Sequence, residues 1–117
     1  MHKIIKVLGL SILLLVTLVA CSQKTYEKEI DQVIKLRNDD LQEYNVKFNI
    51  KKVTKNNSCF KVYEDGNYIA MFVPLHSDDE KEEYIYQKNN GNYELYAESD
   101  TQSILDQEPD YTLNCDE

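Results

Sequence analysis

The stretch Val62-Tyr63-Glu64-Asp65-Gly66-Asn67-Tyr68-Ile69 decides the fold. Its centre, Asp65-Gly66, is a strong signal for a two-residue hairpin turn with positive φ at the glycine, which has no Cβ to clash in that conformation. A turn there pairs Val62 with Ile69, and Phe60 with Met71 further out. The stretch therefore predicts two antiparallel strands, 59–64 and 68–73. The second is apolar on both faces and is expected to be central.

This register sorts the side chains of the hairpin onto two faces, because successive residues of a strand point to opposite sides. One face is apolar and suits a covering helix: Phe60, Val62, Ile69, Met71 and Val73. The other face carries Cys59, Lys61, Tyr63, Tyr68, Ala70 and Phe72. The second face is too aromatic to be left wholly hydrated, so Tyr63, Tyr68 and Phe72 are candidates for partner binding.

A helix is expected ahead of the hairpin, over residues 25–44. Large side chains recur there at spacings of three and four, at Tyr26, Ile30, Val33, Arg37, Leu41 and Tyr44. That spacing forms one stripe on a helix, and the residues between are mostly polar. We expect the stripe to cover the apolar face of the sheet, although a helix that binds a partner is the alternative.

Three more strands complete the prediction. Residues 46–53 alternate apolar and polar, and strands 83–88 and 93–97 flank a turn of Asn and Gly. Residues 98–117 form a polar tail that holds Ile104, Leu105, Tyr111 and Leu113, either in a helical turn or extended. One helix followed by an antiparallel meander is a two-layer α+β domain, with its main body over residues 25–97.

The N-terminal residues have the pattern of an export signal. Lys3 and Lys6 precede an uncharged apolar run over 7–20, too short for a typical spanning helix. Leu18-Val19-Ala20-Cys21 resembles the bacterial lipoprotein signal, the lipobox. The resemblance implies cleavage of 1–20 and diacylglycerol on Cys21, while an uncleaved anchor is the alternative. Residues 21–24 would then be a lipidated tether on the outer, extracytoplasmic face of the cell membrane, with residues 22–24 reaching on the order of 10–15 Å.

Charge narrows the choice of partners. The chain has 13 basic and 21 acidic residues, for a net charge of −8, and loss of Lys3 and Lys6 takes the net charge to −10. Such a chain is a poor ligand for nucleic acid, since phosphates require Lys and Arg. Gly66 and Gly91 stand alone in turns, so the sequence offers no phosphate-binding glycine loop and no nucleotide site.

Cysteine usage adds a covalent prediction. In an exported chain a Cys59–Cys115 disulfide can persist, and we expect it to hold the tail over the second face of the sheet. The alternative is a buried free Cys59 with a loose tail and an exposed aromatic patch.

The side chains offer little for catalysis or for metal. After residue 20, His76 is the only histidine, and nothing near it in sequence supplies a nucleophile. The acidic run 78–83 lacks the spacing and the glycine of a calcium-binding EF-hand loop. The sequence therefore predicts no catalytic residue, no metal, no cofactor and no enzyme activity.

The lipobox, the helix start Tyr26-Glu27-Lys28-Glu29-Ile30 and the hairpin 62–69 together resemble small bacterial lipoproteins of cystatin-like fold. The resemblance implies a curved antiparallel sheet of four to five strands around one helix, without enzyme activity. Some such proteins are carried on integrative conjugative elements, where exclusion of a second element is a known role. The Gln-x-Val-x-Gly and Pro-Trp signatures of cystatin inhibitors are missing at 53–58 and at Pro74-Leu75.

Two functions follow as expectations. The first is a membrane-anchored interaction lipoprotein that recognises an envelope or conjugation-machinery protein. The second is a binding or inhibitory module for a secreted cationic peptide or protease, suggested by the acid-rich half of the chain after residue 57.

Overall fold

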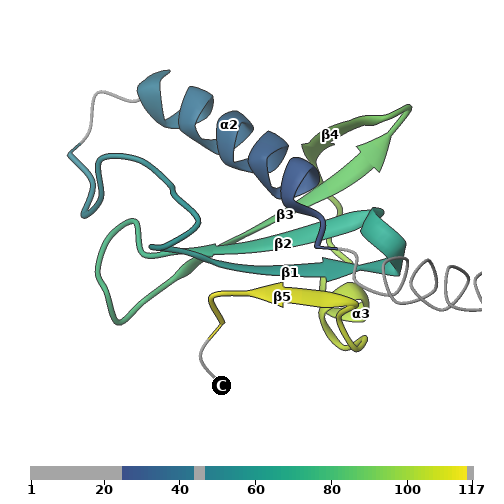
Figure 1. Cartoon of the computed structure of the whole chain (residues 1–117). Helices are drawn as coiled ribbons and strands as arrows, with labels where there is room; N and C mark the ends of the chain where they lie inside the picture. Colours follow the sequence, from purple (N-terminus) through teal and green to yellow (C-terminus); the bar gives the residue numbers. More distant parts are fainter. Residues whose placement is uncertain (1–24, 44–46, 116–117) are drawn as a thin grey trace, which may run out of the picture.

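The computed structural model describes residues 25–43 and 47–115, so the predictions for residues 1–24, including Cys21, lie outside the described residues. One long helix lies across one face of a five-stranded antiparallel sheet, with strand order β4-β3-β2-β1-β5 (Figure 1). The elements are α2 Glu27–Glu43, β1 Cys59–Tyr63, the 3-10 turn η1 Glu64–Gly66, β2 Tyr68–Val73, β3 Glu82–Asn89, β4 Asn92–Leu95, α3 Gln102–Leu105 and β5 Tyr111–Leu113. The predicted α+β architecture, one helix on an antiparallel sheet of four to five strands, is confirmed.

The helix stripe is confirmed for its described members: Tyr26 is buried directly ahead of α2, and Tyr44 lies outside the described residues. Ile30, Val33, Arg37 and Leu41 are the buried residues of α2. They pack on the sheet face that the register assigned to them, where Phe60, Val62, Ile69, Met71 and Val73 are almost fully buried. The main core therefore lies between α2 and β1–β3.

The hairpin register is also confirmed, with Val62 opposite Ile69 and Phe60 opposite Met71. Asp65 (φ 55°) and Gly66 (φ 94°) both have positive φ, as in a type I′ turn, and the Asn67 amide donates to the Glu64 carbonyl at 3.1 Å. Glu64 also has positive φ, at 50°, so the strands end one pair earlier than expected, at Tyr63 and Tyr68.

The strand predicted for 46–53 is wrong. Val46 lies outside the described residues, and 47–53 form a loop. The free edge of β1 that this segment could have joined is occupied instead by β5, which pairs Phe60 with Leu113 and Val62 with Tyr111. The loop forms a backbone hydrogen bond outside the sheet, since the backbone amide of Asn49 donates to the Leu75 carbonyl at 2.7 Å.

The tail proves to be part of the domain, and its predicted placement is half correct. Ile104 packs against the second face of the sheet, with Leu105 beside it. Tyr111 and Leu113 instead belong to β5 and pack with the core on the helix side. The Cys59–Cys115 disulfide is present, with a Cα–Cα distance of 4.8 Å, and it fastens the chain beyond β5 to the start of β1.

Candidate functional site

The second face of the sheet, where partner binding was predicted, is largely closed. Tyr63 is 1% exposed and packs with Ala70, Ile85 and Ile104 beneath the α3 region. The prediction of Tyr63 as a contact residue is therefore corrected, because the tail covers it.

Tyr68 and Phe72 are half-buried at the margin of the same cluster. The Tyr68 ring meets that of Tyr96 edge-on at 5.5 Å, and the Lys61 ammonium lies 5.5 Å from the centre of the Phe72 ring. These contacts belong to the fold, and they leave only the outer parts of the two rings for a partner.

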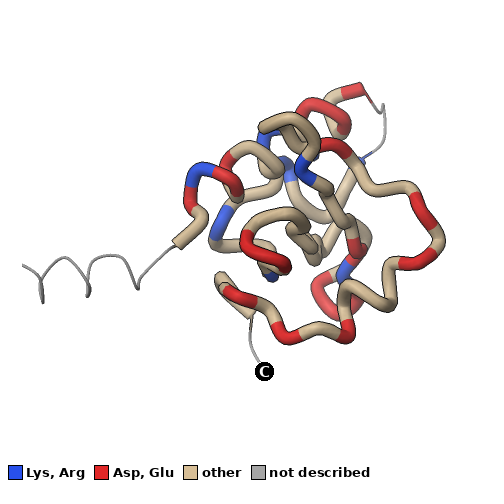
Figure 2. Tube along the Cα trace, turned by 90° about the vertical axis from the view of Figure 1, so that its right-hand side faces the viewer, with Lys and Arg blue, Asp and Glu red and all other residues tan. Residues whose placement is uncertain are grey.

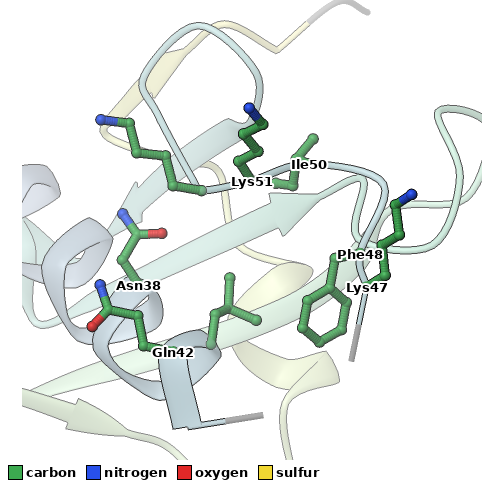
Figure 3. Close-up of a pocket in the computed structure, with 8 residues that line it drawn as sticks. Asn38, Gln42, Lys47, Phe48, Ile50 and Lys51 are labelled. Carbon is green, nitrogen blue, oxygen red and sulfur yellow. The ribbon is translucent and has the colours of Figure 1, made fainter. Parts of the chain in front are cut away.

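A more open site lies at the C-terminal end of α2, where two hollows of about 410 Å³ each meet. Figure 3 shows the first, between α2 and the loop that follows it. It is lined by Asn38, Leu41, Gln42, Lys47, Phe48, Ile50, Lys51 and Lys52. The second is lined by Arg37, Leu41, Phe48, Leu75, His76, Tyr84 and Leu95. Because the hollows share Leu41 and Phe48, we treat them as one feature, the helix-end groove.

The loop wall of the groove is fixed to the helix by a two-way contact. The Asn38 side-chain amide donates to the Val53 carbonyl at 3.0 Å, and the Val53 amide donates back to Asn38 Oδ1 at 2.7 Å. At the other end of the loop, Asn49 donates to the Pro74 carbonyl and to Asp78. Lys51, Lys52 and Ile50 are thereby held between two anchored points.

The groove is cationic in a chain that is otherwise acidic. Lys47, Lys51, Lys52 and Arg37 line it, and no Asp or Glu is among its described lining residues, although Asp40 pairs with Arg37. Among the described residues, none of the three lysines is ion-paired, whereas Lys55 is 3.2 Å from Asp31. Around the rest of the fold, Asp and Glu outnumber Lys and Arg (Figure 2).

Arg37 places a charge inside the groove. It is only 5% exposed, its Nη2 lies 3.0 Å from Asp40, and its guanidinium lies 4.0 Å from the centre of the Tyr84 ring. Its Nε has no hydrogen-bond acceptor within the described part of the chain, nor does the Tyr86 hydroxyl have a partner there. Burial raises the pKa of Tyr86 to about 12, against the opposing effect of Arg37. Buried polar groups are nearly always satisfied, so an unmatched donor marks a candidate contact point.

The other residues singled out from the sequence form no chemical centre. His76 is exposed, and its Nε2 lies 3.4 Å from Glu82 at the margin of the second hollow. Over the described ranges, no group of three or more His, Cys, Asp or Glu residues could hold a metal ion, and no helix is long and apolar enough to cross a membrane.

The sequence carried a signal for this groove that residue patterns alone did not resolve. Arg37 is the one charged member of the apolar helix stripe, and Lys47, Lys51 and Lys52 form a basic run in an acidic chain. Only the folded chain shows that these cations come together.

Comparison with known proteins places the fold in a family. None of the curated proteins compared with the chain matches it significantly. The crystal structure of a DUF4467 family protein from Staphylococcus aureus superimposes with a TM-score of 0.65 at 25% identity, covering 78% of this chain and 99% of that one. The family described as a domain of unknown function with cystatin-like fold matches residues 26–114. The chain therefore belongs to the DUF4467 family of cystatin-like domains.

Proposed function

We propose that the protein is a lipoprotein held at the extracytoplasmic face of a bacterial cell membrane, where it binds another envelope protein without catalysing a reaction. The observation that carries this proposal is the Cys59–Cys115 disulfide. It accounts for two of the three cysteines and leaves Cys21, at the end of Leu-Val-Ala-Cys, for the lipid. Disulfides also persist outside the cytoplasm rather than within it.

The geometry of the domain suits a protein that works close to the membrane. Only residues 22–25 separate Cys21 from Tyr26. Tyr26 is buried beside the β1–β2 turn, where its hydroxyl donates to Asp65 at 2.7 Å. The groove lies at the other end of α2, on the order of 25 Å away for 17 residues. An anchor at Cys21 would thus attach at the end of α2 opposite to the groove, which would leave the groove within reach of a partner such as a component of a conjugation machine.

The anchor is tested by replacing the thiol that would accept the lipid. Cells making the chain or its Cys21→Ser form are labelled with a fatty-acid analogue and then fractionated. We expect label and membrane association in the unchanged chain only. Label retained after Cys21→Ser, or an unchanged chain that is soluble and unlabelled, contradicts the anchor.

The acidic surface favours a second candidate, a binding or inhibitory module for a secreted cationic peptide or protease. Asp100, Asp106, Glu108 and Asp110 are exposed on the segment around α3. Binding of a basic peptide that weakens with salt and with neutralisation of these carboxylates would support this candidate over the first.

A further inference from the structure

We propose that the helix-end groove binds an extended acidic peptide segment that carries an apolar side chain. The proposed function supplies only the location of the partner that bears this segment, namely the envelope. The choice of ligand comes from the chemistry of the groove itself.

Charge complementarity gives the sign of the ligand. Lys47, Lys51 and Lys52 line the groove, and its described lining residues include no Asp or Glu, in a chain of net charge −8. Arg37 also lines the groove, but it is paired with Asp40. The last turn of α2 contains no basic residue and carries Asp40 and Glu43, of which Asp40 is paired with Arg37. Glu43 and the helix end, which is equivalent to about half a charge, together offset only part of the charge of the three lysines. The surplus positive charge is complementary to an anionic ligand.

The floor of the groove shows that charge is not its only feature. Leu41 is 9% exposed, and Phe48 and Ile50 are half-buried. A phosphate polymer would bind the lysines and leave this apolar floor in water. A peptide with a Leu or Phe beside its carboxylates would use both, and each hollow of about 410 Å³ is within the range of small-ligand sites.

The margin of the second hollow suits an extended chain. Leu95 is 47% exposed there, at the end of β4. Among the described strands β4 pairs only with β3, so it is an edge strand, and edges of this kind accept peptides as an added strand. A peptide running from the lysines past Phe48 would reach this edge.

Arg37 supplies a second point of attachment along that route. It lines the second hollow, its guanidinium is stacked on Tyr84, and its Nε lacks an acceptor among the described residues. A carboxylate entering this hollow would meet a cation that is already desolvated and held in place by Asp40. Charge-assisted hydrogen bonds of this kind are the strong ones.

The test measures peptide binding to the full chain in neutral detergent by fluorescence anisotropy. The probe is a labelled peptide of alternating Glu and Phe. Three comparison ligands are the same peptide with Ser in place of Phe, the same peptide with Lys in place of Glu, and inorganic polyphosphate. The variant is Lys47→Gln/Lys51→Gln/Lys52→Gln. Its matched control is Lys28→Gln/Lys81→Gln/Lys88→Gln, which removes the same charge from exposed lysines outside the groove.

We expect the Glu–Phe peptide to bind and the groove variant to weaken that binding by about tenfold or more, as three modest charge pairs would together produce. The control variant should weaken it clearly less. Equal weakening by both variants would mean that only net charge matters and would overturn the proposal. The proposal would also be overturned if the Ser peptide or polyphosphate bound as tightly as the Glu–Phe peptide, or if the Lys peptide bound more tightly. Self-association of the chain that buries the groove would overturn it as well.

The Cys21→Ser chain separates this inference from the proposed function. If it binds the peptide normally but the lipid label is absent from the unchanged chain, the anchor fails and the groove stands. If the label is present and the peptide does not bind, the groove fails and the anchor stands.

Discussion

Asn38 and Val53 are joined by two hydrogen bonds, one in each direction, between a helix side chain and a loop backbone. Apolar and polar residues alternate in the segment that leads to Val53, as in a strand, but this segment is a loop. Its last residue is hydrogen-bonded to a helix side chain instead of to a neighbouring strand. Val53 is 1% exposed, so its amide and carbonyl have no ready substitute for Asn38. The same contact holds the wall of the helix-end groove.

Replacing Asn38 with Ala should therefore destabilise the domain. Both backbone groups of Val53 lose their partner, and we expect a loss of about 1–3 kcal/mol in the free energy of unfolding. Urea denaturation measures it. Asn56→Ala is the control, because Asn56 is exposed in the following turn and its side chain makes no hydrogen bond found in the described residues. Equal effects of the two changes would show that the Asn38–Val53 contact is not needed.

The two turn glycines allow strain to be separated from crowding. Gly66 and Gly91 have similar φ, 94° and 83°, but a Cβ on Gly66 would lie 3.3 Å from Tyr26. A Cβ on Gly91 would have no neighbour within 4 Å in the described part of the chain. Both Gly→Ala changes should cost roughly 1 kcal/mol or more through backbone strain. Gly66→Ala should cost more in a thermal melt, because it also displaces Tyr26. Equal losses would mean that the Tyr26 ring moves aside freely.

Removing the disulfide should cost about 4 kcal/mol, since the bridge closes a loop with a sequence separation of 56. The double change Cys59→Ala/Cys115→Ala tests this in chemical denaturation. Counting thiols in the denatured, unreduced protein from an oxidising source provides the check on the bond itself. Reactive thiols at both positions would contradict the bridge, whatever the stability of the variant.

Alkaline pH should weaken the fold through its buried tyrosines. Burial above all raises the pKa of Tyr26, Tyr86 and Tyr93 to about 12, with a hydrogen bond to Asp65 adding to the effect at Tyr26. The folded state therefore holds these protons more tightly than the unfolded state. The tyrosines therefore contribute to the free energy of unfolding in full below pH 10, their pKa in the unfolded chain. This stabilisation is lost as the pH rises toward 12.

Tyr93→Phe isolates one of these groups. It removes the hydrogen bond from the Tyr93 hydroxyl to the Gly66 carbonyl, which should cost about 1 kcal/mol at neutral pH. Between pH 10 and 12 its stability should then fall less steeply than that of the unchanged chain, by up to about 1.4 kcal/mol per pH unit. All other ionisable groups are the same in both chains, so their effects cancel in the difference. Parallel curves would mean that Tyr93 ionises in the fold as it does in water.

The success and the failure of the sequence predictions have the same physical origin. The hairpin around Asp65-Gly66 was predictable because a turn of two residues fixes the register of everything beside it. Residues 46–53 carry an equally regular alternation, but no local signal shows whether a sheet edge is free. The edge of β1 is paired with Tyr111–Leu113 instead. This strand has only three residues, too few to give a recognisable strand pattern in a polar tail.

The groove could not be predicted for a related reason. Arg37 and the lysines of the following loop become neighbours only when Asn38 folds that loop back on α2. The closure of the second face depended likewise on α3, which brings Ile104 over Tyr63. The disulfide could be predicted from the sequence, because only Cys59 and Cys115 remained once Cys21 was assigned to the lipid.

The measurement that tests the central claim most directly is photocrosslinking in intact host cells, with the crosslinker at Gln42 in the groove or at Asn67 in the β1–β2 turn. Both positions are exposed. Gln42 is in the last turn of α2, whereas Asn67 follows Gly66, which lies beside Tyr26 just ahead of α2. If the groove receives a partner's acidic segment, we expect a discrete adduct from Gln42 and none from Asn67. The triple change Lys47→Gln/Lys51→Gln/Lys52→Gln should abolish the Gln42 adduct. An adduct formed equally from Asn67, or one from Gln42 that survives the triple change, would contradict it.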